Sequence, residues 1–478
     1  MSDKLLTHYD AILLGSGQAG NPLAAAFAAK GKRVALVERA LIGGTCVNYG
    51  CTPTKTMVAS AEVAYLARRG PEFGIHPGSN SPTTSTDIPL WVDMPAVRER
   101  KRAIVKQWRE GSEKSLKDVD IIHGEGSFLG PKQILVRLNS GGQLTLTADL
   151  VVIDTGLAPA IPSIPGLDQV PFLDNASVME LDQLPEHLLI LGGGYIGLEF
   201  AQMFRRFGSR VTVVQDSAQL LPHEDEDLAE AITKILREDG IEILLNTHAD
   251  AAAYTDNTIH LTVRQTSGSK TITGSHLLVA AGRHPNTDRL NLAAAGISTN
   301  THGFVQVDDY LQTNVPGVYA VGDVNGGPEF THVAYDDYRI LNANLLESPG
   351  TRPRNTRDRI LPYCVFIDPQ LGRVGLSEKE AAKAGIKVRV ARLPMTSVAR
   401  AMETGQSRGF MKALVHPETK QILGAAILGL DGGEIMGMLQ IAMLGKLPYP
   451  VLQSAVLAHP TLAEALNNLF RKFDDKQP

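Results

Sequence analysis

Two of the three cysteines in the chain, Cys46 and Cys51, lie in the glycine- and threonine-rich stretch GGTCVNYGCTPTK. Two nearby thiols can bind a metal, cross-link the fold or exchange electrons. Four residues separate this pair, which is not the CxxC spacing of a zinc site, and no second Cys/His cluster accompanies it in the sequence. We therefore expect no metal site at these cysteines.

A disulfide between Cys46 and Cys51 requires a break in regular helical geometry. Residues five apart on an ideal helix have Cα atoms roughly 8–9 Å apart, beyond the limit of about 7 Å for a disulfide. Gly50, next to Cys51, supplies the backbone freedom for that break. A strained, locally closed disulfide is easily reduced, which favours a redox switch over an inert cross-link. Two buried cysteines without a bond are the alternative.

A redox pair needs an electron donor, and the stretch YDAILLGSGQAGNPLAAAFAAKGKRVALVER predicts a dinucleotide site formed by a strand, a glycine turn, a helix and a second strand. Gly15 permits the tight turn, and Gly17 lets backbone N–H groups approach a diphosphate. Gly20 allows the helix to lie close to the strand. Glu38, which ends the second strand, is placed to accept hydrogen bonds from an adenosine ribose.

The same pattern returns in HLLILGGGYIGLEFAQMFRRFGSRVTVVQD, with glycines at Gly192, Gly194 and Gly197. Gln215 follows the first of these glycines by 23 positions, the same spacing as Gly15 to Glu38. Two equal copies predict two dinucleotide sites, one for a flavin and one for a nicotinamide. No arginine closely follows Gln215 to bind a 2′-phosphate, so NADH is weakly preferred over NADPH. The three nearby arginines are interpreted as solvated charges, with phosphate binding as the alternative: Arg205, Arg206 and Arg210.

The composition limits the partners and the compartment. The 478 residues carry 46 Lys and Arg against 51 Asp and Glu, a formal charge of −5, without a basic block that indicates nucleic acid binding. The first residues lack the features of a signal peptide, and no apolar run is long enough to span a bilayer. We expect a cytoplasmic protein that binds neither nucleic acid nor membrane.

GGTCVNYGCTPTK resembles the active-site segment of the flavoprotein pyridine nucleotide-disulfide oxidoreductases, the family of dihydrolipoamide dehydrogenase, glutathione reductase and mercuric reductase. The resemblance extends along the chain through AILLGSGQAG, VVIDTGLAPAIPSIPG, LLVAAGRHPNT, GVYAVGDVNGGP and AHPTLAEALNNLF. One departure is Asp154, at a position where alanine is usual in the family. The resemblance implies an α/β fold with two Rossmann-like domains of the glutathione-reductase type, for FAD and NAD(P), and a C-terminal α+β dimerisation domain.

The resemblance also implies domain limits and a partner. The FAD-binding domain would comprise residues 1–155 and 285–352, the NAD(P)-binding domain 156–284 and the interface domain 353–478. The protein would be a homodimer in which the interface domain of one subunit completes the active site of the other. Outside these motifs, Cys364 in the run LPYCVFIDPQ is interpreted as a small core residue. The segment 78–89 is predicted to be a polar, mobile loop.

The resemblance assigns roles to individual residues. Cys51 would lie nearest the flavin as the charge-transfer thiolate, and Cys46 would exchange with the acceptor. His459 would act as acid and base with Glu464 orienting its ring, and Lys55 would lie near the flavin N5, paired with Glu199. Tyr195 would cover the flavin until nicotinamide enters, although a core-packing role is nearly as well supported. Further contacts to FAD are expected from Gly44, Thr45, Thr155, Gly156, Gly322 and Asp323, and contacts to NAD(P) or FAD from Gly282 and Arg283.

The predicted activity is NAD(P)H-dependent reduction of a small-molecule acceptor through FAD and a Cys46–Cys51 disulfide. The His459–Glu464 pair favours a disulfide acceptor, as in dihydrolipoamide dehydrogenase, because departing thiolates need protons. Reduction of mercury(II) or copper(II) is the alternative, although the tail FRKFDDKQP lacks the vicinal cysteines of mercuric reductases. A non-catalytic flavoprotein that binds or regulates a larger complex is a second alternative.

Overall fold

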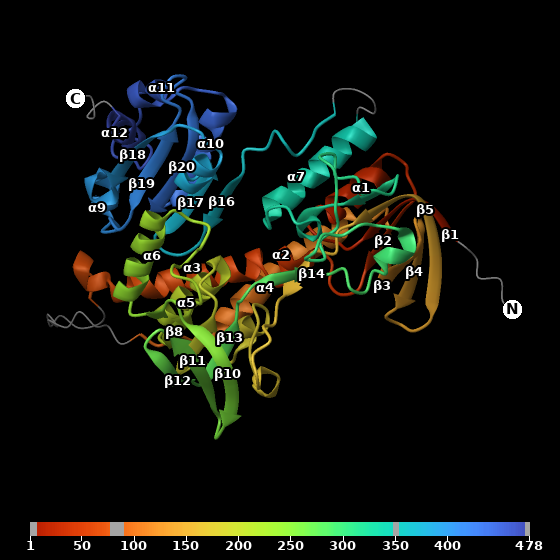
Figure 1. Cartoon of the computed structure of the whole chain (residues 1–478), viewed down its shortest axis with the longest axis horizontal. Coiled ribbons are helices and arrows are strands. Elements are labelled where there is room, and N and C mark those ends of the chain that lie inside the picture. The colour runs from red at the N-terminus through yellow and green to blue at the C-terminus, as the bar shows by residue number, and fades with distance from the viewer. Residues whose placement is uncertain (1–6, 77–89, 348–352, 474–478) are drawn as a thin grey trace.

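The computed structural model describes residues 7–76, 90–347 and 353–473. The predicted loop at 78–89 lies outside these ranges. Figure 1 shows three lobes, with the orange helix α3 running alongside the second and third lobes. Among the described residues, the helices are too short or too polar to cross a membrane.

The first lobe is an α/β unit built on strands that are apolar on both faces, as a sheet covered on both sides requires. Its parallel strands lie in the order β3–β2–β1–β5–β15, and β4 joins β3 and β5 as an antiparallel bridge. The strands are β1 (Thr7–Leu14), β2 (Val34–Glu38), β3 (Asp120–Gly130), β4 (Gln133–Leu138), β5 (Gln143–Ile153) and β15 (Val318–Ala320). Helices α1 (Gly20–Ala29) and α7 (Thr331–Asn342) pack on the same face.

The second lobe repeats this construction. Its parallel sheet has the order β13–β7–β8–β9 and is joined by an antiparallel layer of three strands, β10–β11–β12. The strands are β7 (His187–Leu191), β8 (Arg210–Val214), β9 (Glu242–Leu244), β10 (His248–Thr255), β11 (Thr258–Gln265), β12 (Gly268–Gly274) and β13 (His276–Val279). Its helices are α5 (Tyr195–Phe207) and α6 (Glu226–Glu238). The chain enters and leaves through a two-stranded pair, β6 (Leu157–Pro159) with β14 (Arg283–Pro285).

The third lobe is an antiparallel sheet in the order β16–β17–β20–β19–β18 with helices around it. The strands are β16 (Pro362–Val365), β17 (Gln370–Gly375), β18 (Arg389–Pro394), β19 (Phe410–Val415) and β20 (Ile422–Gly429). The helices are α8 (Glu378–Lys383), α9 (Ala399–Glu403), α10 (Gly432–Leu444), α11 (Tyr449–Ser454) and α12 (Ala465–Arg471). The predicted fold class, two dinucleotide-binding units and an α+β domain, is confirmed, while the domain limits stay a prediction.

Three helices place the cysteine segment between the lobes: α2 (Gly44–Asn48), α3 (Cys51–Arg68) and α4 (Met94–Ser115). The helix breaks between α2 and α3 at Gly50, where a Cβ would lie 3.1 Å from the carbonyl oxygen of Thr45. The predicted backbone break beside the cysteine pair is therefore present. Short helical turns complete the fold: η1 (Gly70–Phe73), η2 (Leu167–Gln169), η3 (Ser177–Glu180), η4 (Leu292–Ala295), η5 (Gly322–Asn325), η6 (Ala343–Glu347) and η7 (Met395–Ser397).

A buried ion cluster fixes the second lobe on the third. The ammonium of Lys412, which is fully buried on β19, contacts Asp225 at 2.7 Å, Asp227 at 2.8 Å and Glu378 at 2.8 Å. Asp225 and Asp227 begin α6, whereas Glu378 begins α8. Three acidic groups so close together resemble a cation site, and Lys412 itself is the cation that occupies it. The cluster therefore holds the two lobes in a fixed orientation.

Candidate active site

The two glycine turns have the same geometry. Gly15 and Gly192 have positive φ angles of 105° and 109°, and a Cβ at either would lie 2.3 Å from a carbonyl oxygen, of Asp154 and Ala280 respectively. A Cβ at Gly20 would lie 2.5 Å from the carbonyl oxygen of Gly15. At Gly197 the corresponding distance, to Gly192, is 2.2 Å. Larger residues are therefore excluded at the turn and at the contact between helix and strand, as a dinucleotide-binding turn requires.

The residues that end the second strands, Glu38 and Gln215, also correspond. The amide N–H of Ser16 donates to Glu38 Oε2 at 3.0 Å, and that of Gly193 donates to Gln215 Oε1 at 2.6 Å. Both side chains are buried and line the cavity described below. Glu38 also accepts from Ser16 Oγ and from the amide of Ala40. A carboxylate has about four acceptor positions, so Glu38 retains one for a ribose hydroxyl.

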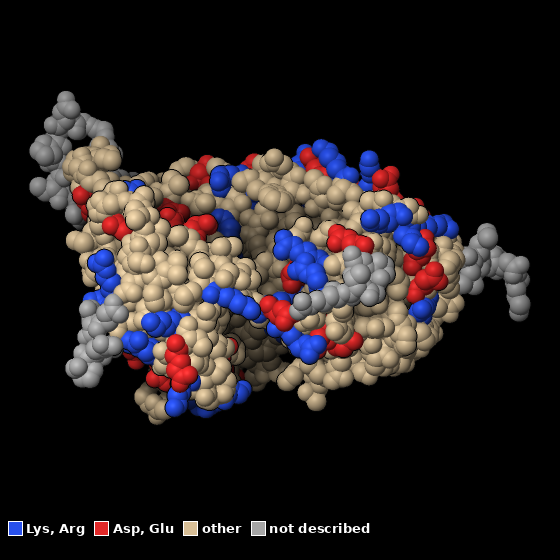
Figure 2. Space-filling model, turned by 90° about the horizontal axis from the view of Figure 1, so that it is seen from above, with Lys and Arg blue, Asp and Glu red and all other residues tan. Residues whose placement is uncertain are grey.

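One cavity of about 1550 Å³ joins the two glycine turns to the cysteine pair. Figure 2 shows a deep hollow between two lobes, with acidic and basic side chains interspersed on the surrounding face. The predicted site residues that line the cavity are Gly15, Gly17, Glu38, Gly44, Thr45, Cys46, Cys51, Lys55, Thr155, Gly156, Gly192, Gly194, Tyr195, Glu199, Gln215, Gly282, Arg283, Gly322 and Asp323. The structure therefore brings together the predicted site residues, apart from four that do not line the cavity: Gly20, Gly197, His459 and Glu464.

Unsatisfied polar atoms beside the first glycine turn fit a dinucleotide. The hydroxyl of Thr155 is buried and has no hydrogen-bond partner among the described residues. Buried polar groups in proteins are almost always hydrogen-bonded, so such an atom next to a glycine turn indicates a ligand. Asp323 also lines the cavity, and its carboxylate accepts a hydrogen bond from Arg283 at 3.0 Å. These residues fit FAD, whose ribityl and diphosphate oxygens would be bound from this side.

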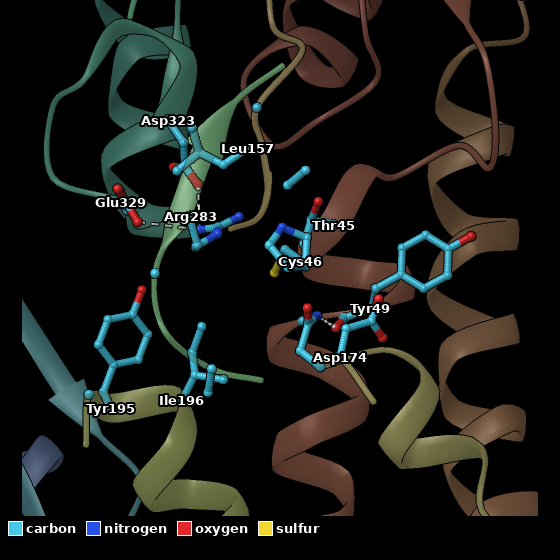
Figure 3. Close-up of a pocket in the computed structure, with 18 of the residues that line it drawn as sticks. Thr45, Cys46, Tyr49, Leu157, Asp174, Tyr195, Ile196, Arg283, Asp323 and Glu329 are labelled. Carbon is cyan, nitrogen blue, oxygen red and sulfur yellow. Dashed lines mark hydrogen bonds and ion pairs between the residues drawn. The ribbon is translucent and has the colours of Figure 1, made fainter. Parts of the chain in front are cut away.

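Figure 3 shows how the two dinucleotide units meet in the cavity. Arg283, on β14, is linked to Asp323 and to Glu329, whose carboxylate is 3.7 Å from the guanidinium. Burial raises the pKa of Asp323, and the charge of Arg283 opposes that rise. Tyr195 lies with its ring centroid 6.0 Å from that of Phe330 and lines the cavity. Tyr195 also packs against the hydrophobic core of the second lobe, so its position is compatible with both the covering role and the core-packing role.

The cysteines are free thiols in this structure, and their environments differ. A hydrogen bond from Cys46 lowers the pKa of Cys51 to about 6, and the same bond together with burial raises the pKa of Cys46. Cys51 is also the first residue of the 18-residue helix α3, whose positive end stabilises an anion. At neutral pH Cys51 is therefore the thiolate and Cys46 keeps its proton.

Two further groups stabilise the Cys51 thiolate. The hydroxyl of Thr331 lies 3.1 Å from Cys51 Sγ, and the charge of Lys55 also lowers the Cys51 pKa. Lys55 Nζ is 2.5 Å from Glu199 Oε2, and the second oxygen of Glu199 accepts from the amide of Phe366 at 2.9 Å. The predicted pair of Lys55 with Glu199 is therefore present and joins all three lobes.

Thr331 was missed by sequence reasoning. It is the first residue of α7, 280 positions after Cys51, and only the fold brings the two together. The available signal was a threonine that closely follows the motif GVYAVGDVNGGP. Its hydroxyl can donate to a thiolate, which makes Thr331 a positioning residue for the charge on Cys51.

Replacing Thr331 with valine is expected to raise the Cys51 pKa by about one unit, because a charge-assisted hydrogen bond is lost without a change in side-chain shape. The measurement is the rate of Cys51 alkylation against pH, with Cys46 and Cys364 both replaced by serine so that Cys51 is the thiol that reacts. The midpoint should move to higher pH in Thr331→Val and stay in place in Thr331→Ser. An unchanged midpoint in the valine variant would show that the hydroxyl does not stabilise the thiolate.

His459 and Glu464 form a pair, with Nδ1 2.8 Å from a carboxylate oxygen, at a distance from the cavity of their own chain. Helix α12 begins at Ala465, Glu464 caps it, and His459 lies in the preceding loop. His459 is 67% exposed, so its second ring nitrogen is open to a partner.

Two sequence interpretations are corrected. Cys364 lies on β16 as expected, but it is half-buried and lines the cavity instead of the core, and burial raises its pKa to about 12. Arg206 is buried in an ion pair with Asp368 instead of solvated. Arg205 donates a hydrogen bond to the carbonyl oxygen of Asp239, and the guanidinium of Arg210 lies 3.7 Å from the Glu242 carboxylate. None of the three arginines lines the cavity.

Two dinucleotide turns that open into one cavity with a thiolate–thiol pair define an oxidoreductase that passes electrons between a dinucleotide and a dithiol. The chain belongs to the pyridine nucleotide-disulphide oxidoreductase family, whose model matches residues 9–337, and the family's dimerisation domain matches residues 361–470. Members are flavoproteins that use FAD and a pyridine nucleotide. The protein is accordingly an NAD(P)H-dependent flavoenzyme with a dimerisation domain.

Similar proteins match along nearly the whole chain. A probable pyridine nucleotide-disulfide oxidoreductase, RclA of Escherichia coli, is 36% identical over 97% of this chain and 99% of its own length. A mercuric reductase of Streptomyces lividans is also 36% identical, over 96% of this chain and 95% of its own. The solved structure of the copper(II) complex of RclA matches with a TM-score of 0.86 at 35% identity, over 97% of this chain and 99% of that one.

Proposed function

We propose that the protein is an NADH-dependent reductase in which the Cys46–Cys51 dithiol reduces a small disulfide. The observation that carries the proposal is the asymmetry of the cysteine pair. Cys51 is a thiolate near neutral pH, whereas the pKa of Cys46 is raised, so Cys46 needs a base before it can attack an acceptor. An imidazole paired with a carboxylate is such a base, and His459 with Glu464 provides it.

The chemistry balances as a two-electron exchange. FAD, when bound, supplies the transfer of two electrons from the nicotinamide hydride to the cysteine pair. His459 takes the proton of Cys46, whose sulfur then bonds to one sulfur of the acceptor disulfide. The first departing thiolate recovers that proton from the imidazolium. Cys51 then displaces the second sulfur as a thiolate, which is protonated from solvent, and the Cys46–Cys51 bond closes.

The exposed surface around His459 supports a homodimer with a shared site. Neither His459 nor Glu464 lines the cavity with the cysteines, so the base must come from a second subunit. Helix α10 of the third lobe precedes this pair in the sequence and carries two exposed apolar residues. Ile441 is 68% exposed and Leu444 is 56% exposed. Surfaces of this kind bind a partner, and the chain carries the family's dimerisation domain.

NADH is preferred over NADPH because the end of the second turn offers no arginine to a 2′-phosphate. The side chain of Gln215 accepts a hydrogen bond from the amide of Gly193 in the turn, and Asp216 adds a negative charge to the same part of the cavity. Arg205, Arg206 and Arg210 are held elsewhere.

Copper(II) reduction is the second candidate, because the similar structure of RclA is a copper(II) complex. With copper(II), the Cys46–Cys51 pair would lose two electrons and the proton of Cys46 as the disulfide forms, and two ions would become copper(I). The metal would be a substrate here and not a resident group. This reaction has no thiolate leaving group, so it does not need His459 as an acid.

Turnover with NADH and with NADPH, each against lipoamide, glutathione disulfide, mercury(II) and copper(II), distinguishes these functions. We expect disulfide turnover that falls at least about 100-fold in His459→Ala, since general acid–base catalysis contributes that much. Copper(II) turnover that survives His459→Ala, without turnover of any disulfide, would favour the second candidate. Flavin binding without turnover of any acceptor would contradict both and favour a non-catalytic flavoprotein.

A further inference from the structure

Asp154 places a carboxyl group against the first glycine turn, on the cavity wall. Its Oδ2 accepts a hydrogen bond from the amide of Gly20 at 2.7 Å, in the first turn of the ten-residue helix α1. A Cβ at Gly17 would lie 2.7 Å from this oxygen, and one at Gly322 would lie 3.1 Å from Oδ1. The carboxyl therefore fills the space that the two FAD motifs enclose.

The second oxygen of this carboxyl, Oδ1, lies between Gly17 and Gly322, since a Cβ at either position would be 3.1 Å from it. Asp154 is 7% exposed and lines the cavity, and Oδ1 makes no hydrogen bond to any described residue. Thr155, the next residue, also has a buried hydroxyl without a partner. A buried hydroxyl without a partner, next to a carboxyl oxygen that no protein group binds, indicates a ligand that carries hydrogen-bonding oxygens.

The second glycine turn provides an internal comparison. Ala280 occupies there the position that Asp154 occupies in the first, because each amide donates to the carbonyl that ends the first strand, of Leu191 and Leu14, at 2.8 Å. A Cβ at Gly194, the counterpart of Gly17, would meet nothing within 4 Å. The second turn therefore leaves open the space that Asp154 fills in the first.

The charges around Asp154 decide its protonation. Burial is the largest cause of its raised pKa, and the charges of Asp323 on η5, Asp337 on α7 and Glu38 on β2 raise it further. The nearby cations are already paired, Arg283 with Asp323 and Arg359 with Asp337. Only the amide of Gly20 stabilises the anion, so the pKa of Asp154 is well above its usual value.

We propose that Asp154 is a ligand of the FAD diphosphate and binds it as a neutral carboxylic acid. One oxygen accepts from the amide of Gly20, and the hydroxyl donates to a phosphate oxygen. An ionised carboxylate would instead add a fourth negative side chain next to two phosphates. FAD affinity then depends on a single proton, which must be present on Asp154 for tight binding.

The test is FAD release from the holoenzyme on dilution, followed by flavin fluorescence, between about pH 5 and about pH 9. In the wild-type protein the FAD dissociation constant should rise once the pH exceeds the pKa that Asp154 has in the FAD-free protein. The rise should reach up to about tenfold per pH unit. Asp154→Asn can make the same two hydrogen bonds at every pH. Its dissociation constant should match that of the wild type at low pH and stay constant.

Asp154→Ala distinguishes a hydrogen-bond donor from a space-filling side chain. It should also release FAD independently of pH, with a dissociation constant about tenfold above that of Asp154→Asn, since one hydrogen bond is missing. Tighter binding by both variants across the whole pH range would show a repulsive carboxylate and overturn the proposal. Equal affinity of Asn and Ala variants, or a wild-type constant that does not change with pH, would also overturn it. Thermal unfolding of both variants checks the fold.

Discussion

Replacing Cys46 with serine is expected to lower acceptor turnover at least about 10³-fold, while NADH still reduces the bound flavin. Serine keeps the hydrogen bond to Cys51 but cannot form a bond to a second sulfur. Cys51 remains a thiolate at the start of α3, so the flavin side of the site is retained. The measurement is anaerobic: flavin bleaching by one equivalent of NADH, followed by turnover with the acceptor that the wild-type protein prefers.

Cys364→Ser is the matched control, because Cys364 lines the same cavity but belongs to no sulfur pair. It should keep both flavin reduction and turnover within about twofold of the wild type, as expected for a residue outside the reacting atoms. Full turnover in Cys46→Ser would show that electrons leave the flavin without the cysteine pair. Loss of flavin reduction in Cys46→Ser would place Cys46 on the nicotinamide side instead.

The dinucleotide units and the cysteine segment could be predicted because their signals are local. Gly15 and Gly192 each need a positive φ and a neighbouring strand, and both requirements are visible within about thirty residues of sequence. The pair of Lys55 with Glu199 was predicted only through the family resemblance. Neither residue has a local signal, since one lies on α3 and the other on α5.

Residues whose role depends on contacts between lobes could not be predicted from local pattern. Thr331 contacts Cys51 only because the fold places the first residue of α7 next to the first residue of α3. Arg206 has the sequence context of an exposed helix charge, but Asp368 of the third lobe packs over it. Cys364 lies in an apolar strand whose one face opens into the cavity. Strand pattern identifies the element, but the lobe that covers each face is set by the tertiary fold.

Asp154 shows a different limit. Its departure from the usual alanine was visible in the sequence, but the consequence depends on where the carboxyl points. Contact with Gly20 and the surrounding carboxylates favours the neutral acid, whereas an exposed aspartate at the same position would be an anion. The physical effect of the substitution was therefore accessible only from the structure.

A heterodimer of one Cys46→Ser subunit and one His459→Ala subunit is expected to recover about half of the wild-type turnover, although each homodimer is nearly inactive. In this mixed dimer one site contains both substitutions and the other contains neither. The reason is geometric: His459 does not line the cavity that contains Cys46 of its own chain, so the proposed shared site takes its base from the second subunit. Two affinity tags on co-expressed subunits allow the mixed dimer to be purified and its disulfide turnover measured.

The matched control is a heterodimer of a wild-type subunit and a subunit that carries both substitutions. It contains the same substituted residues, but each of its sites lacks either Cys46 or His459. A shared site therefore makes the control inactive and the mixed dimer half-active. A site within one chain reverses the result, because the control would keep one intact chain and the mixed dimer none. The comparison thus identifies which subunit supplies the base without depending on the stability of either variant alone.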